Sequence, residues 1–127
     1  DRWLLNRLEL IEPRFGKVLK VGISAPPIET PFGWLLLYHW VVDIKGAAHY
    51  KMGAALLELE NPTLVLHKDL LLLEPEMDYE KIGLIPNVIF PCGAVLLKDE
   101  IFLYYGAADK VIGVAKMKLQ FILDKFK

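Results

Sequence analysis

A histidine stands where a strand is expected to end, in the segment GWLLLYHW at residues 33–40. A glycine, an apolar run and aromatic side chains are typical of a buried strand, and His39 lies where this run should give way to a loop. An imidazole near neutral pH can donate a hydrogen bond to an anion or transfer a proton. A hydrogen-bonded histidine without chemistry is the alternative. Whatever the neighbouring strands bring to this end decides between the two interpretations.

The other residue types that commonly carry chemistry form no recognisable motif. Three histidines (His39, His49 and His67) and a single cysteine, Cys92, are too scattered in the sequence for a zinc site. The sequence also contains no glycine-rich phosphate loop and no nucleophile motif. We therefore expect no metal and no organic cofactor. We expect Cys92 to be a small buried hydrophobic residue.

The composition predicts a single domain with more apolar surface than it can bury. Of 127 residues 54% are hydrophobic, whereas about 45–50% is usual. A domain of this size buries only about two-thirds of the surface that its unfolded chain exposes. We therefore expect a second copy, or a chain that supplies further strands, to cover part of the apolar surface.

Charge and hydropathy exclude two kinds of partner. Fifteen Lys and Arg against sixteen Asp and Glu give a net charge of -1, without the basic stripe of a nucleic-acid-binding protein. No apolar run approaches the roughly 18–20 residues of a membrane helix. The first residues do not resemble a secretion signal, and a single cysteine excludes an internal disulfide. These features predict a cytoplasmic protein.

Short apolar segments separated by turn residues predict an all-β, antiparallel fold. Proline, glycine, asparagine and aspartate mark the turns, and no helical segment lies between the runs. The expected strands are 17–23, 34–42, 49–59, 64–68, 92–98, 100–107 and 110–117. A helical spacing of apolar residues predicts a short C-terminal helix over about 117–126, through Leu119, Ile122, Leu123 and Phe126.

The predicted strands form two units of similar content. Each unit has an apolar strand that ends in Leu-Tyr and a later strand with a glycine among small or apolar residues. The tyrosines, Tyr38 and Tyr104, are 66 residues apart, and the glycines, Gly53 and Gly113, are 60 apart. Such a period is typical of β-propeller blades. Because a propeller needs at least about four blades, the chain is expected to form part of a ring.

Four segments are similar, in the same order, to segments of one enzyme family. They read GISAPPIETPFGWLLLYHW, YKMGAALLELENPTLVLH, LLEPEMDYEKIGLIPNVIFPCGAVL and YYGAADKVIGVA. With them the chain resembles, from about Leu8 to Val114, the C-terminal part of the β-mannoside phosphorylases and related enzymes of glycoside hydrolase family 130. The resemblance implies about two blades of a five-bladed β-propeller. Residues 1–127 would then be a single partial domain, with blade-like units at about 17–68 and 86–117.

The resemblance implies phosphorolysis of a β-mannosidic bond, with inorganic phosphate as co-substrate and an aspartic acid as general acid. It assigns phosphate binding to Lys20, His39 and Tyr50. An ammonium and two hydrogen-bond donors suit this role, because they stabilise a dianion. Without the resemblance, Lys20 reads as an exposed strand lysine and Tyr50 as a half-buried aromatic residue.

The resemblance also assigns residues to the sugar. Asp109 matches a carboxylate that binds hydroxyls of the mannose at the cleavage site, and Asn87 and Phe90 are expected to line this site. The plain alternatives are turn residues, since Asp and Asn are common in turns.

Two departures from the family pattern affect the expected activity. Trp40 stands where the family has a glycine after the histidine, and its indole would block or repack the phosphate contact. The catalytic aspartate and the phosphate-binding arginines would precede Asp1, so no catalytic residue is assigned. General acid catalysis is typically worth about 10²–10⁴-fold in rate, so the chain is expected to be inactive alone.

Three hypotheses remain open from the sequence. The chain is a fragment of a β-mannoside phosphorylase or glycosidase, a subunit of an enzyme whose other blades lie on another chain, or a non-catalytic carbohydrate-binding or self-assembling β module.

Overall fold

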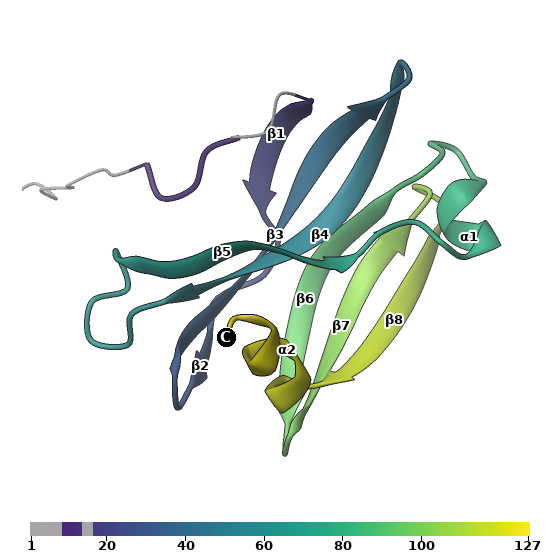
Figure 1. Ribbon diagram of the computed structural model, residues 1–127. Helices are drawn as coiled ribbons and strands as arrows, with labels where there is room; N and C mark the ends of the chain where they lie inside the picture. The colour runs from purple at the N-terminus through teal and green to yellow at the C-terminus, as the bar shows by residue number, and fades with distance from the viewer. Residues whose placement is uncertain (1–8, 14–16) are drawn as a thin grey trace, which may run out of the picture.

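The computed structural model describes residues 9–13 and 17–127, whose strands form two antiparallel sheets (Figure 1). Sheet A contains β1 (Val18–Ile23), β2 (Ile28–Thr30), β3 (Gly33–Ile44), β4 (Ala47–Leu57) and β5 (Val65–Leu73). Sheet B contains β6 (Ile89–Leu97), β7 (Glu100–Ala107) and β8 (Val111–Lys118). The helices are α1 (Asp78–Lys81) and α2 (Leu119–Lys125). The predicted all-β antiparallel fold with a C-terminal helix is confirmed.

Apart from β1, which pairs with β3 and not with β2, strands that follow one another within a sheet pair with one another, as in propeller blades. Sheet A has the order β1-β3-β4-β5 with β2 beside β3, and sheet B is the meander β6-β7-β8. The sequence did not predict β2 or α1, because three or four residues are too short to show a periodic pattern. Neither helix in the described part of the chain is long and apolar enough to cross a bilayer.

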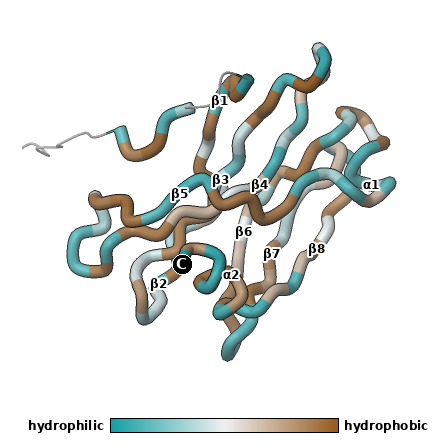
Figure 2. Tube along the Cα trace, in the orientation of Figure 1, coloured by the Kyte–Doolittle hydropathy of each residue, from teal (hydrophilic) through white to brown (hydrophobic). Residues whose placement is uncertain are grey.

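The larger core lies between the two sheets and under α2. Figure 2 shows hydrophobic residues along the strands and hydrophilic ones at the hairpin tips. Because side chains alternate between the faces of a strand, every second residue of β3, β4 and β7 enters this core. Its buried members are Leu35, Leu37, Met52, Ala54, Ile89, Ile101, Leu103, Tyr105, Ala107 and Ile122.

A second core covers the opposite face of sheet A. Its buried members are Leu36, Tyr38, Trp40, Ala55 and Leu57. The opposite face of sheet B differs, because large apolar side chains there are exposed, among them Val95, Tyr104, Ile112 and Val114. We call this surface the open face of sheet B.

Both sheets contain a tyrosine that lies opposite a glycine of the neighbouring strand. In sheet B this tyrosine is not the one that the sequence predicts. Tyr38 lies opposite Gly53 in the pairing of β3 with β4, and Tyr105 lies opposite Gly113 in the pairing of β7 with β8. Tyr105 is 3% exposed, whereas Tyr104 is 46% exposed. The counterpart of Tyr38 is therefore Tyr105, because alternation along β7 turns Tyr104 to the open face.

Candidate functional site

Three neighbouring strands of sheet A bring together the residues assigned to phosphate. In the strand register Lys20 and Tyr50 both lie opposite Val41, on either side of β3. The Lys20 ammonium lies 5.5 Å from the centroid of the Tyr50 ring. The ring of His39, two residues before Val41 on β3, lies 6.2 Å from that of Tyr50. An ammonium, an imidazole and a phenol thus gather on one face of the sheet.

The position of His39 depends on two residues that the sequence analysis did not single out. His39 pairs with Gly22 across the sheet, and a Cβ on this glycine would lie 2.7 Å from ring atoms Cε1 and Nε2. Only glycine leaves room for the ring here. On the other edge of the His39 ring, the Oγ atom of Ser24 lies 3.0 Å from Nδ1, within hydrogen-bond distance. Both residues lie in the quoted GIS segment, but only the register of β1 on β3 shows their role.

His39 is 7% exposed, so its surroundings determine its protonation state. Burial, and then the positive charge of Lys20, lower the pKa of this histidine below its usual value. The ring is therefore neutral at neutral pH. When the Ser24 hydroxyl donates to Nδ1, the proton of the neutral ring lies on Nε2, from which it can be donated to an oxyanion.

The residues assigned to the sugar lie next to this group. A cavity of about 350 Å³ is lined by Tyr50, Ile85, Val88, Phe90, Cys92, Gly106 and Asp109. The ring of Phe90 lies 4.6 Å from that of His39 and 6.3 Å from that of Tyr50, so it connects the two groups. Asn87 adjoins the cavity through its backbone, since its carbonyl accepts a hydrogen bond of 2.9 Å from the N–H of Tyr50.

Asn87 and Asp109 adopt a backbone conformation that suits these residue types. Their φ angles are 60° and 51°, in the left-handed region that Asn and Asp tolerate better than most residues. The turn between β7 and β8 alone accounts for an aspartate at 109. Its place in the cavity wall, with an exposed side chain, makes the carboxylate available to a ligand.

Two expectations about neighbouring residues are wrong. Trp40 does not block the residues assigned to phosphate, because alternation along β3 turns its side chain to the opposite face of the sheet from His39. There its ring lies 5.6 Å from Tyr38, over Gly53, where a Cβ would overlap it. Cys92 is exposed rather than buried, since it points away from the core of sheet B and lines the cavity.

The arrangement is suited to a ligand with an anionic part and a hydroxyl-rich part. Lys20, His39 and Tyr50 offer a cation and hydrogen-bond donors to the anion. Asp109 offers a carboxylate to hydroxyl groups, and Phe90 lies between the two ends. Over residues 9–13 and 17–127 no group of three or more His, Cys, Asp or Glu is placed to hold a metal ion.

Comparisons with known proteins give one consistent family. The profile of glycoside hydrolase family 130, described as beta-1,4-mannooligosaccharide phosphorylase, matches residues 6–127. A 1,2-beta-oligomannan phosphorylase of Thermoanaerobacter sp. (strain X514) is 45% identical over 109 residues, which cover 85% of this chain and 36% of that protein. A beta-1,2-mannobiose phosphorylase of the same organism is 49% identical over 106 residues, which cover 80% and 34%.

A solved structure agrees with these relatives. The beta-1,2-mannobiose phosphorylase from Listeria innocua, in complex with beta-1,2-mannobiose, superposes with a TM-score of 0.83 at 41% sequence identity. The match covers 92% of this chain and 33% of that chain. The chain therefore spans about a third of the length of the relatives that it matches.

Proposed function

The chain belongs to glycoside hydrolase family 130, and we propose that it forms part of an enzyme that phosphorolyses β-mannosides. The observation that carries this proposal is the grouping of Lys20, His39 and Tyr50 beside the cavity that Asp109 lines. Phosphate binds at the first group, and the mannose at the cleavage site binds in the cavity.

The reaction requires each of these groups in a defined role. An oxygen of inorganic phosphate attacks the anomeric carbon, the glycosidic C–O bond breaks, and the leaving oxygen takes a proton from a general acid. Lys20 neutralises charge on the phosphate, while His39 Nε2 and the Tyr50 hydroxyl donate hydrogen bonds to it. Asp109 and Asn87 bind hydroxyls of the mannose, and the Phe90 ring packs against the sugar.

The linkage that we propose is β-1,2. The two Thermoanaerobacter relatives, at 45% and 49% identity, and the Listeria structure are all named for β-1,2-linked mannosides. Inorganic phosphate is the co-substrate, as the phosphorylase names imply, and no further cofactor is proposed. A cytoplasmic location suits an enzyme that consumes phosphate and a protein with a single cysteine.

We propose that turnover needs groups beyond those of this site. Among the described residues that line the cavity, Asp109 supplies the one carboxylate, and it is committed to the sugar. A leaving alkoxide without a general acid loses a factor of about 10²–10⁴ in rate. The 127-residue chain therefore binds both ligands but does not release mannose 1-phosphate.

The open face of sheet B is the proposed place of association. Ile112 is 84% exposed and Val114 is 54% exposed, which is unusual for neighbouring apolar strand residues. Another blade of the same fold would cover this face, supplied by further residues of the enzyme or by a partner chain. In the isolated chain a second copy takes that place.

Calorimetric titration of the 127-residue chain with inorganic phosphate and with β-1,2-mannobiose tests the proposed function. We expect both to bind, and Lys20→Ala to weaken phosphate binding about tenfold, as for loss of a charge-assisted hydrogen bond. Lys17→Ala, which removes an exposed lysine just before β1, is the matched control and should leave both affinities unchanged.

Other outcomes contradict specific parts of the proposal. Mannobiose binding without any phosphate binding would identify a carbohydrate-binding module instead of a phosphorylase. Release of mannose 1-phosphate by the purified chain would show that its own residues supply the general acid.

A further inference from the structure

A buried carboxylate lies outside the groups described above. Glu80, in α1, is 5% exposed. Its Oε2 accepts hydrogen bonds from the backbone N–H groups of Glu76 at 2.8 Å and Met77 at 2.9 Å. Its Oε1 accepts one from the hydroxyl of Tyr105 at 2.6 Å. The carboxylate thus joins the segment around α1 to strand β7, because each of its oxygens is bound to a different one of them.

The partner on β7 is held in place equally firmly. Tyr105 is 3% exposed, and a Cβ on Gly113 of the neighbouring strand would lie 2.6 Å from its ring atom Cζ. The phenol therefore fits only because position 113 is a glycine. Burial, and then the hydrogen bond to Glu80, raise the pKa of Tyr105, so the phenol stays protonated and remains a donor.

A continuous path of backbone hydrogen bonds leads from Glu80 to the cavity. The Glu80 carbonyl accepts from the N–H of Val88 at 3.1 Å, and the Val88 carbonyl accepts from the N–H of Ala108 at 3.0 Å. The Ala108 carbonyl in turn accepts from the N–H of Ile85 at 3.1 Å. We call residues 77–88 the strap. It includes Asn87, and through Ala108 it borders Asp109.

The fit between the strap and the end of β7 is close. A Cβ on Gly83 would overlap the carbonyl oxygen and the Cβ of Ala108. Val88, Ala107 and Ala108 are all buried at this contact. Figure 1 shows α1 beside the end of β7 and the start of β8, at the opposite end of sheet B from the β6–β7 hairpin. A shift of α1 would therefore move the residues of the strap that line the cavity and also Asp109, which follows Ala108.

We propose that Glu80, acting through Tyr105, is a positioning residue that sets the place of Asn87 beside the cavity and of Asp109 in its wall. The part that concerns the sugar rests on the function proposed above. Lys20 and His39 belong to sheet A, and the path from Glu80 does not pass through them. Tyr50, the third residue assigned to phosphate, contacts the strap through its backbone N–H, which donates to the Asn87 carbonyl. Loss of the Glu80–Tyr105 hydrogen bond therefore weakens sugar binding more than phosphate binding.

Two substitutions test this proposal on the 127-residue chain. Tyr105→Phe removes the hydroxyl and keeps the ring, and Glu80→Gln turns an amide toward groups that themselves donate. The matched control is Tyr38→Phe, which removes a buried tyrosine hydroxyl that donates to Asp69 at 3.0 Å within sheet A. Each variant is measured by amide hydrogen exchange and by titration with inorganic phosphate and with β-1,2-mannobiose.

We expect Tyr105→Phe and Glu80→Gln to speed exchange of the Val88 and Ala108 amides at least about tenfold and to weaken mannobiose binding about tenfold. Phosphate affinity should stay within about twofold. Tyr38→Phe should leave the exchange rates of these two amides and the affinity for mannobiose unchanged. This should hold even if Tyr38→Phe lowers the melting temperature as much as Tyr105→Phe does. Should Glu80→Gln fail to fold, Tyr105→Phe decides together with Tyr79→Phe, because the Tyr105 hydroxyl also lies 3.2 Å from that of Tyr79. Tyr79→Phe keeps the hydrogen bond from Tyr105 to Glu80 and should leave the exchange of both amides unchanged.

The opposite results overturn the proposal. These are unchanged exchange at Val88 and Ala108 in Tyr105→Phe, or an equal loss of mannobiose affinity in Tyr38→Phe. If the wild-type chain binds neither ligand, the proposed function fails, and the exchange measurement alone decides whether Glu80 positions the strap.

Discussion

The two sheets contain the same local arrangement, a buried tyrosine opposite a glycine, and differ in what the tyrosine holds. The Tyr38 hydroxyl donates to Asp69 of β5 and accepts from its backbone N–H at 2.8 Å, so this contact stays within sheet A. The Tyr105 hydroxyl donates to Glu80, which lies outside sheet B. The buried tyrosine of sheet A is thus held within its own sheet, whereas that of sheet B is held by the strap, which contributes Ile85 and Val88 to the wall of the cavity.

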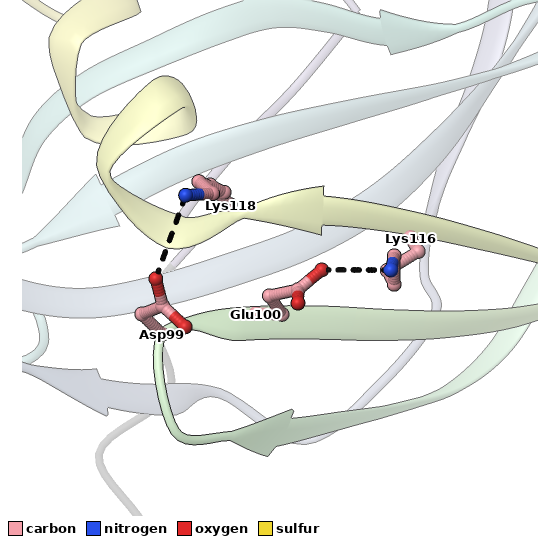
Figure 3. Close-up of polar contacts among 4 residues, drawn as sticks. All are labelled: Asp99, Glu100, Lys116 and Lys118. Carbon is pink, nitrogen blue, oxygen red and sulfur yellow. Dashed lines mark ion pairs between the residues drawn. The ribbon is translucent and has the colours of Figure 1, made fainter.

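The sheets also differ in how many of their faces are covered. Sheet A has a core on each face, but sheet B has a core on one. The open face of sheet B is apolar toward the cavity end and charged toward the β6–β7 hairpin, where Lys116 pairs with Glu100 and Lys118 with Asp99 (Figure 3). Such exposed ion pairs add little stability, so the apolar part dominates what this face can bind.

The largest expected difference is in the effect of substitutions on the free energy of unfolding, between the core face and the open face of sheet B. Leu103→Ala on the core face should lower the free energy of unfolding by about 2–5 kcal/mol, because it leaves a cavity at a fully buried site. Val114→Thr on the open face keeps the branched shape and should change it by less than about 0.5 kcal/mol. Urea denaturation followed by circular dichroism, at low protein concentration, measures both.

If Val114→Thr lowered the free energy of unfolding as much as Leu103→Ala, the difference between the two faces of sheet B would be contradicted. It would mean that the open face is buried even in the dilute chain.

The next prediction concerns association through the open face. Sedimentation at micromolar concentration should show the chain as a dimer rather than a 14.5 kDa monomer. Ile112→Lys should raise the dissociation constant about tenfold or more, since a charge in an apolar contact must be desolvated. Val111→Lys, one residue away at the start of β8, is the control and should have less effect, because its side chain alternates to the other face.

A stable wild-type monomer at this concentration would show that the isolated open face does not bind a second copy.

The smallest effect is expected from His39 in sheet A. Its pKa is lowered in the folded state by burial and by Lys20, so below pH 6.5 the unfolded chain takes up the proton first. Stability that is present above pH 6.5 should therefore be lost progressively as the pH falls toward 5. In His39→Gln this part of the pH dependence should disappear. Thermal denaturation between pH 5 and 8 without phosphate measures it, and an unchanged pH profile in the variant would contradict the assignment.

The sequence by itself determined most of the strands and the C-terminal helix. Apolar runs bounded by turn residues predicted seven of the described strands and the C-terminal helix, because these patterns are local. The resemblance to family 130 identified Lys20, His39, Tyr50, Phe90 and Asp109 as neighbours, and the structure brings them together. Their roles in binding remain predictions.

Only the tertiary structure decided which face each residue occupies and which distant residues support the site. A shift of one residue along β7 separates exposed Tyr104 from buried Tyr105, and a run of apolar residues does not reveal which of the two enters the core. Gly22 under His39, and Glu80 bound to Tyr105, are pairs from separate strands or segments. Such contacts depend on strand register and on the packing of the strap against β7, and neither is encoded in any local pattern of the chain.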